Sequence, residues 1–321
     1  MIFFLSAPTD NRGKNRNGYA LEAMGHSVVY FDYRKETKKH GKPTMQKMLI
    51  AKVKSAAPDI FFQKAQGPDP EILTAVREYC NFTCCWWFDY RPEFPQWIAE
   101  YAENVDYFFT VVKSWEAHHP NITFMPQGFN VFEHPKVRSQ GVITDVAFVG
   151  GIGGGGYRKK LLQKLYYPLL NQGVTLQVYG YPRVWRDCPF SAGRQVEGES
   201  FSSIVNSAHI NLGLFPFDQK IRPSGYQSNR IHQTIGAGGF FLTYETESLD
   251  LLYTPGKEVE TYSQKNPMDI ENLCEKILAL LGPEKARREK IRKAGYERAM
   301  RDHQYDRRFE QILDLMPEDA R

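Results

Sequence analysis

The sequence lacks several features that would place the chain in a well-defined class. Its five cysteines are odd in number and follow neither a disulfide framework nor a Cys-x-x-Cys metal spacing, so we interpret them as reduced thiols of a cytoplasmic protein. No stretch approaches the roughly 20 consecutive apolar residues of a membrane-spanning helix. The opening MIFFLSAP has too short an apolar run for a signal peptide. These absences predict a soluble protein without a membrane span, and they leave its oligomeric state open.

The composition and the order of patterns indicate a two-domain α/β protein. With 321 residues, 42% of them hydrophobic, the chain is long enough to bury two cores. Short β-branched and aromatic runs alternate with longer amphipathic stretches, which is typical of parallel sheets covered by helices. The predicted strands of the first series are IFFLSAP, SVVYFDY, DIFFQKA, TCCWWFDY and DYFFTVV, with a helix from Pro70 to Tyr79. Those of the second are DVAFVGG, TLQVYG, AHINLGLF, GFFLTYE and EVETYS.

The segment MPQGFNVFEHPKVRSQG between the two series is rich in turn formers and has no clear period, so we place the domain junction there. We expect an amino-terminal Rossmann-like domain over residues 1–135 and a second one over 136–302. The charged tail from Pro283 onward predicts helices, and its interleaved Glu and Arg residues indicate a solvated face rather than a nucleic-acid surface.

A glycine cluster directly follows the first strand of the second series. Gly151, Gly153 and Gly156 fit G-x-G-x-x-G, a pattern that lets backbone amides approach phosphate at the start of a helix. A dinucleotide site also needs an acidic residue at the end of the next strand, where this chain has Val178-Tyr179-Gly180-Tyr181. No Gly-Lys-Ser/Thr follows, which excludes a P-loop. The loop therefore indicates a phosphate or diphosphate site other than NAD, with Arg158 as its charge partner.

A second phosphate-facing segment is SGYQSNRIHQTIGAGGFFLT. Ser228 or Asn229 is expected to cap a helix whose positive dipole end faces a ligand, and Arg230 in its first turn opposes that dipole. A bound anion would explain this arginine; a surface salt bridge is the alternative. Lys220 and Arg222, in the loop after AHINLGLF, are expected at the same edge of the sheet.

In this order, the motifs resemble the CgeB-like (spore-maturation protein B) glycosyltransferases of the GT-B fold. The resemblance covers about residues 85–313 and rests on WWFDYRPEF, DYFFTVVKSW, FMPQGFN, DVAFVGG with Tyr157-Arg158, SNRIHQTIGAGGFFLT and LLYTPGKEVETYS. It implies two Rossmann-like domains facing across a cleft, with a final helix, about residues 303–321, crossing back to the first. It also implies a nucleotide-sugar donor, often a UDP-sugar, on the second domain and the acceptor on the first.

One residue departs from the family pattern. Where members usually carry Glu, this chain has Gln233, at a position that the resemblance places on the donor ribose. Gln still hydrogen-bonds hydroxyls but carries no charge, which leaves the donor and the stereochemical outcome open. The expected donor-binding residues are Gly151, Gly153, Gly154, Arg158, Tyr181, Lys220, Arg222, Ser228, Asn229, Arg230 and Gln233.

Metal-dependent glycosyltransferases of the other common fold hold a divalent cation with an Asp-x-Asp pair, and this sequence has none. We therefore expect no metal site and no cofactor, with cationic side chains and helix dipoles stabilising the diphosphate. The candidate catalytic base is Asp89, at the end of TCCWWFDY. Its aromatic neighbours are expected to desolvate it and raise its pKa, and capping the turn before Pro92 is the alternative role.

Charge is concentrated at the amino end. Residues 1–64 carry twelve basic and five acidic residues, a net charge of +7 against +4 for the whole chain. Arg12, Lys14 and Arg16 lie in the loop after the first strand and are expected to bind an anionic acceptor. DNA or RNA with a hydroxyl-bearing modified base is one candidate, its extruded base stacking on Trp87. A solvated lysine-rich face without a partner is the alternative.

The function hypotheses are thus three. The first is a metal-independent glycosyltransferase acting on DNA, or on a polysaccharide or protein acceptor. The second is a catalytically silent relative that binds nucleotide or nucleic acid, which Gln233 favours. The third is an NAD enzyme, which the missing acidic residue disfavours.

Overall fold

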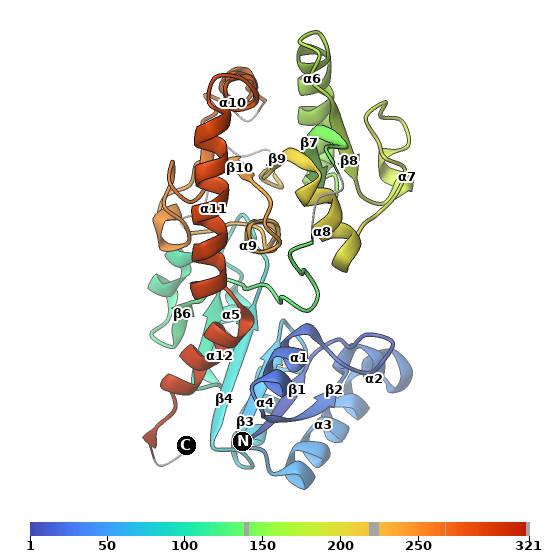
Figure 1. Ribbon diagram of the computed structural model, residues 1–321. Coiled ribbons are helices and arrows are strands. Elements are labelled where there is room, and N and C mark those ends of the chain that lie inside the picture. Colours follow the sequence, from blue (N-terminus) through green and yellow to red (C-terminus); the bar gives the residue numbers. More distant parts are fainter. Residues whose placement is uncertain (138–140, 218–224, 267, 319–321) are drawn as a thin grey trace. The chain divides into compact units, whose positions relative to one another are not determined.

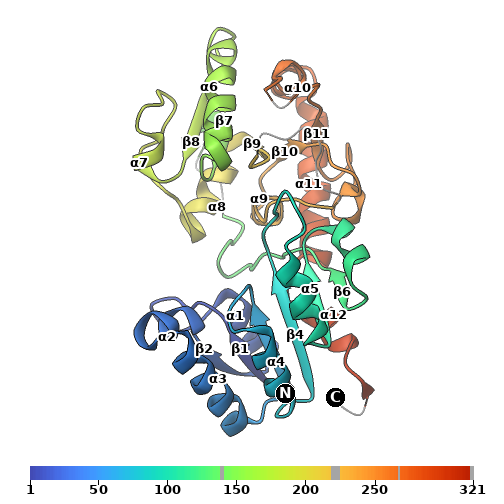
Figure 2. The ribbon, with the colours of Figure 1, turned by 180° about the vertical axis from the view of Figure 1, so that it is seen from behind.

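The structure is a computed structural model, and it describes residues 1–137, 141–217, 225–266 and 268–318 (Figures 1 and 2). The chain divides into two compact units. Unit 1 comprises Met1–Gln127 and Tyr305–Arg321, and unit 2 comprises Gly128–Gln304. The chain therefore leaves unit 1 once and returns to it with its last segment.

Unit 1 is a parallel six-stranded sheet in the order β2-β1-β3-β4-β5-β6. Its strands are β1 (Ile2–Ser6), β2 (Ser27–Phe31), β3 (Ile60–Lys64), β4 (Phe82–Trp87), β5 (Tyr107–Thr110) and β6 (Ile122–Phe124). Its helices are α1 (Arg16–Ala23), α2 (Tyr33–His40), α3 (Lys42–Ala56), α4 (Pro70–Arg77), α5 (Gln96–Glu103), the 3-10 turn η1 (Lys113–His118) and α12 (Tyr305–Asp314).

Local sequence explains where these elements begin. All six residues of β4 are buried, as expected for a central strand covered on both faces. Asn15 caps α1 by accepting a hydrogen bond from the Asn17 amide, and Asp32 caps α2 by accepting from the Lys35 amide at 2.9 Å. Asp32, a carboxylate at the end of β2, therefore has a structural role.

The final helix belongs to the core of unit 1. Tyr305 and Phe309 of α12 pack against Phe3, Phe62 and Trp86, with ring centroids 5.8–6.3 Å apart. Burying an aromatic side chain of this size contributes about 1.5–3 kcal/mol, so α12 is an integral layer of unit 1 rather than a loose tail.

Unit 2 is a parallel five-stranded sheet in the order β11-β10-β9-β7-β8. Its strands are β7 (Thr144–Val149), β8 (Leu176–Tyr179), β9 (Ala208–Leu212), β10 (Phe241–Tyr244) and β11 (Glu260–Tyr262). Its helical segments are η2 (Gly154–Gly156), α6 (Tyr157–Leu170), α7 (Pro182–Trp185), α8 (Gly198–Asn206), α9 (Arg230–Gly236), η3 (Leu249–Leu251), α10 (Glu271–Leu281) and α11 (Lys285–Asp302).

The ten strands predicted from the sequence are confirmed, and so is the helix predicted from Pro70. The short edge strand β6 was not predicted. The predicted charged tail is helical but breaks at His303, so that α11 and α12 are separate helices in different units. Across the part of the chain that the structure describes, no helix combines the length and apolar character needed to span a bilayer.

Candidate active site

The strand order of unit 2 identifies the edge where a ligand is expected. From β7 the chain moves to β8 on one side and then to β9 on the other, so the topological switch lies between the carboxyl ends of β7 and β9. In open parallel sheets ligands bind outside this point. The loop Gly150–Gly156 follows β7, and residues 213–217 follow β9.

The glycine loop fits closely against the loop after β9. The Gly154 amide donates to the Pro216 carbonyl oxygen at 2.7 Å, and a Cβ on Gly153 would lie 2.5 Å from that oxygen. Gly153 also has φ +77°, which disfavours any other residue. The Gly156 and Arg158 amides donate within the loop, to Gly153 and Ile152. Several amides that were expected to face a phosphate thus donate hydrogen bonds to carbonyl oxygens of the protein itself.

Two arginines converge beside this loop. Arg158, in the first turn of α6, is buried and its Nε donates to the Leu214 carbonyl oxygen at 2.9 Å. Arg230, the first residue of α9, donates from Nη1 to the Val149 carbonyl oxygen at 2.8 Å. Both guanidinium carbons lie over the Phe148 ring, 5.8 and 5.2 Å from its centroid. Both arginines therefore lie at the carboxyl end of β7.

Neither guanidinium has a carboxylate ion-pair partner among the described residues. The Arg230 Nε is buried and has no hydrogen-bond acceptor there. Burial, followed by the charge of Arg158, lowers the pKa of Arg230 to about 9, and burial also lowers the pKa of Arg158. Two cations are thus held together without a described counter-charge, which is costly unless an anion binds.

Gly150 is required by this arrangement. A Cβ at Gly150 would lie 1.9 Å from the Arg230 Nη1 atom, so a larger residue would displace the guanidinium from its present position. The sequence suggested that the glycines let a phosphate approach the backbone; at this position the glycine lets an arginine approach it.

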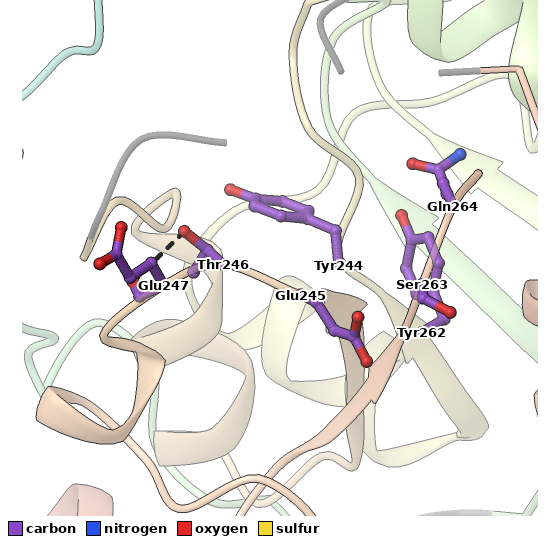
Figure 3. A pocket seen from close by; sticks show the side chains of 7 residues that line it. All are labelled: Tyr244, Glu245, Thr246, Glu247, Tyr262, Ser263 and Gln264. Atoms are coloured by element: carbon purple, nitrogen blue, oxygen red, sulfur yellow. Dashed lines mark hydrogen bonds between the residues drawn. The ribbon is translucent and has the colours of Figure 1, made fainter. Parts of the chain in front are cut away.

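A pocket of about 270 Å³ opens beside the arginine pair, at the carboxyl ends of β10 and β11 (Figure 3). Tyr244 and Tyr262 form its buried side, and both phenols interact electrostatically with Arg158. Tyr262 donates to the Gly213 carbonyl oxygen at 3.2 Å, which ties the pocket to the loop after β9. The pocket is lined by Tyr244, Glu245, Thr246, Glu247, Tyr262, Ser263 and Gln264.

Carboxylates, hydroxyls and an amide are the groups that hydrogen-bond a polyol, so this pocket suits ribose or sugar hydroxyls. Sequence reasoning missed these residues. The signal was present, because Glu245 is the last residue of the predicted strand GFFLTYE and Ser263 is the last residue of the predicted strand EVETYS. Residues just after parallel strands are expected at the ligand edge.

The other predicted donor residues differ in their exposure and in the hydrogen bonds that they make. Tyr181 is 64% exposed at the start of α7, and Gln233 is half-buried in α9. Asn229 occupies the N-cap position of α9, but its side chain makes no capping hydrogen bond and its buried Oδ1 has no described partner; Ser228 caps with its backbone carbonyl only. The expected side-chain cap is therefore absent. Lys220 and Arg222 lie outside the described residues.

In unit 1, Asp89 follows β4 as predicted, but it is solvent-exposed. The desolvation expected from its aromatic neighbours does not occur, because Trp86 and Trp87 are themselves buried in unit 1. Trp87 is only 7% exposed, and Trp97 packs edge-on against it with centroids 5.0 Å apart. Little of the Trp87 ring is therefore exposed, and its role as a stacking face for a base stays a prediction.

The basic loop after β1 is largely neutralised by its own acids. Arg12 pairs with Asp10 at 3.0 Å, and Lys14 pairs with Glu22 at 2.7 Å. Partial desolvation raises the pKa of Asp10, but hydrogen bonds from the Lys14 and Arg12 amides outweigh this effect and lower the pKa to about 2. Arg16 is exposed on α1. Arg12 and Lys14 are thus weaker anion ligands than their sequence suggests.

The second half of the chain is similar to a known protein family. Residues 158–314, which include Arg158, Arg230 and the Tyr244 pocket, match the family model described as glycosyl transferase-like. This region is glycosyl transferase-like. No curated protein matches the sequence.

Solved structures share the fold over nearly the whole chain. A glycosyltransferase from Rickettsia africae has a TM-score of 0.66 at 10% identity, covering 99% of this chain and 98% of that one. Anabaena Alr3699/HepE, solved with UDP and glucose, has 0.63 at 10% identity, covering 98% and 99%. Sucrose-phosphate synthase from Thermosynechococcus elongatus has 0.63 at 10% identity, covering 98% of each. The predicted GT-B fold is confirmed.

The matched region and the fold together support a glycosyltransferase. The narrower resemblance to CgeB-like proteins stays a prediction. For metal binding, no group of three or more His, Cys, Asp or Glu side chains gathers within the described ranges.

Proposed function

We propose that the protein transfers a sugar from a nucleotide-diphosphate sugar, a UDP-sugar above all, to a hydroxyl acceptor. The observation that carries this proposal is the pair Arg158 and Arg230, because the Arg158 side chain and the Arg230 Nε are buried and neither guanidinium has a described carboxylate partner. A diphosphate supplies the missing negative charge, and guanidinium groups bind its oxygens with charge-assisted hydrogen bonds.

The same two arginines would also catalyse the departure of the diphosphate leaving group. When the bond between the sugar and the diphosphate breaks, negative charge builds up on the leaving phosphate oxygen. Cations already held in place stabilise that charge without reorganisation, which lowers the barrier. Because Arg158 and Arg230 supply two positive charges, we propose that the reaction needs no metal ion.

The pocket beside Tyr244 would receive hydroxyl groups of the donor. Glu245, Ser263 and Gln264 present acceptors and donors to a polyol, and Gln233 on α9 would contribute an uncharged amide. UDP as the nucleotide is supported by HepE, a protein of the same fold that was solved with UDP-glucose.

For the acceptor, we propose Asp89 as the base that takes the hydroxyl proton. It is exposed directly after the carboxyl end of β4, where a substrate hydroxyl can reach it. We propose nucleic acid with a hydroxyl-bearing base as the acceptor, since unit 1 carries the +7 excess of residues 1–64. A hydroxyl group of a polysaccharide or protein is the competing acceptor. For either acceptor, we propose that the reaction takes place in the cytoplasm.

A panel of nucleotide sugars tests the donor assignment in two steps. Thermal shift identifies the nucleotide that binds, and release of nucleoside diphosphate with an acceptor measures transfer. We expect UDP and a UDP-sugar to stabilise the protein, with transfer unchanged by a chelator. Arg230→Met should abolish both signals, and Arg292→Met, which removes an arginine paired with Glu289, should keep them.

Three results would contradict parts of the proposal. Stabilisation by UDP without turnover of any donor would favour the silent nucleotide-binding relative. Loss of transfer on chelation would overturn metal independence. Failure of every nucleotide sugar to bind would overturn the function itself.

A further inference from the structure

The strongest feature outside the proposed donor site is the basic surface of α2 and α3. These two helices follow one another in the chain and pack together in unit 1 (Figures 1 and 2). Between residues 33 and 56 they carry eight Lys and Arg residues and one acid, Glu36. All eight basic side chains are exposed, and they are Arg34, Lys35, Lys38, Lys39, Lys42, Lys47, Lys52 and Lys54.

Almost all charges on this surface lack an ion-pair partner among the described residues. Of the eight, only Lys42 makes an ion pair with a described residue, Asp69. The helix α11 offers an internal comparison, since it also carries eight Lys and Arg residues. Six of those eight pair with carboxylates, among them Arg292 with Glu289 and Arg298 with Asp302. The basic charge of α11 is therefore balanced within its own unit, and that of α2 and α3 is not.

A pocket of about 520 Å³ opens at one side of this basic surface. Arg34 and Lys38, one helical turn apart on α2, line it together with Trp97 of α5. Trp97 is only partly buried, and the Tyr33 and Tyr101 rings lie buried beside it. The acids of the pocket are Asp69, which Lys42 neutralises, and Glu100.

The segment after β3 that lines this pocket has an unusual backbone conformation. Ala65, just after β3, has φ +63°, a left-handed conformation that a residue with a Cβ rarely adopts. The Gly67 amide then donates to the Tyr101 hydroxyl at 3.1 Å, and that hydroxyl donates to the Pro68 carbonyl oxygen. A Cβ on Gly67 would lie 2.6 Å from the Gln63 Nε2 atom. The loop is thus fixed at the carboxyl end of β3, where ligands of open sheets bind.

We infer that the α2–α3 surface and the Trp97 pocket bind single-stranded nucleic acid, the strand backbone on the cations and one base in the pocket. This inference rests on the proposed function in that it supplies the docking site of the acceptor. Cations without described carboxylate partners beside a partly exposed aromatic ring are the combination that binds single strands without sequence preference. A duplex would satisfy the cations but keeps its bases stacked inside, so it leaves the Trp97 pocket unused.

The test measures the affinity of a fluorescein-labelled oligo(dT) strand of about 20 nucleotides by anisotropy, without donor and over about 50–200 mM salt. The test variant is Lys38→Ala/Lys39→Ala/Lys47→Ala, whose three side chains are exposed and unpaired with described carboxylates. The matched control on α11 removes the same charge from exposed lysines and is Lys285→Ala/Lys290→Ala/Lys293→Ala.

Single-strand binding loses about 0.7 in the slope of log affinity against log salt for each phosphate contact removed. We therefore expect the α2–α3 variant to bind at least tenfold more weakly at the lowest salt, with a slope reduced by about 2. The α11 control should match the wild type. Trp97→Ala should weaken binding by about 5- to 100-fold with an unchanged salt slope, and Trp97→Phe should restore most of it.

Several outcomes would overturn the inference. Equal losses in the two lysine variants would mean that only net charge matters. Tighter binding of the matching duplex, or displacement of the strand by a polyuronate of equal charge at the same concentration, would identify a different polyanion. Because UDP thermal shift is measured on the same variants, failure of strand binding with an intact UDP response leaves the donor proposal standing, and the reverse result leaves this surface standing.

Discussion

Replacing Arg230 with methionine should stabilise the free protein and abolish its response to UDP. Most mutations destabilise, so a gain in stability together with a loss of binding is a distinctive signature. It is expected because Arg230 carries a charge for which the described residues provide no counter-charge.

The size of the effect follows from the pKa of Arg230, which burial and the charge of Arg158 lower from its ordinary value to about 9. Each pKa unit corresponds to about 1.4 kcal/mol, so holding the protonated guanidinium costs about 5 kcal/mol at neutral pH. Methionine removes that cost but loses the hydrogen bond to Val149 and the contact with Phe148, together about 2–5 kcal/mol. The net expectation is a gain of about 0–3 kcal/mol in the free energy of unfolding.

The pH dependence has a defined sign. Arg230 has a lower pKa in the folded than in the unfolded state, so the unfolded state binds more protons above about pH 9. The cost of its charge is therefore fully present below about pH 9 and fades above it. The stability advantage of Arg230→Met should shrink as pH rises through 9.

The assay is urea unfolding of wild type and variant, with and without UDP at about 100 times its dissociation constant, where bound ligand adds about 2.7 kcal/mol. Arg292→Met serves as control and should lose about 1 kcal/mol, because that guanidinium donates to Glu289 and to the Gly238 carbonyl oxygen. The reasoning is refuted if Arg230→Met destabilises the free protein by more than Arg292→Met and keeps the full UDP response.

Three further predictions concern single residues. Gly153→Ala should cost about 1–3 kcal/mol in urea unfolding, because φ is +77° and the Cβ meets Pro216; Gly155→Ala, also at positive φ but with no atom within 4 Å, should cost less. Asp89→Asn should abolish transfer while the UDP thermal shift stays unchanged, and near-normal turnover would remove Asp89 from the role of base. Asp10→Asn should flatten the fall in melting temperature between pH 4 and 2, since the carboxylate of Asp10 stabilises the fold above its ordinary pKa and loses that effect as pH falls towards about 2.

Sequence patterns predicted the fold well because parallel sheets bury their strands on both faces. The run FTCCWW is apolar at nearly every position, which marks β4 without reference to the rest of the chain. The strand β6 has only three residues and no such run, so its pairing with β5 could be seen only in three dimensions.

The candidate site was predictable in outline but not in its contacts. Arg158 was predicted because it lies at the start of the helix after the glycine loop, and Arg230 because a basic residue in the first turn opposes the helix dipole; both residues do lie in a first helical turn. That both guanidinium groups would lie over the Phe148 ring depends on segments 72 residues apart in the chain. Similarly, a basic loop gives no sign that Asp10 will fold back on Arg12, because the partner of a charge is set by the turn between them.

The two sets of unpaired cations differ in burial, and this difference predicts how salt acts on each substrate. Arg158 and the Nε of Arg230 are buried, where counter-ions do not screen their attraction for an anion, whereas Lys38 and Lys47 are exposed. Exposed charges lose most of their attraction beyond a Debye length, about 10 Å at 0.1 M salt. In steady-state kinetics, raising salt should therefore increase KM for a nucleic-acid acceptor steeply and leave KM for the donor nearly constant. A donor KM that rises as steeply as the acceptor KM would show that both substrates meet an exposed surface, and would contradict the assignment of Arg158 and Arg230 to the diphosphate.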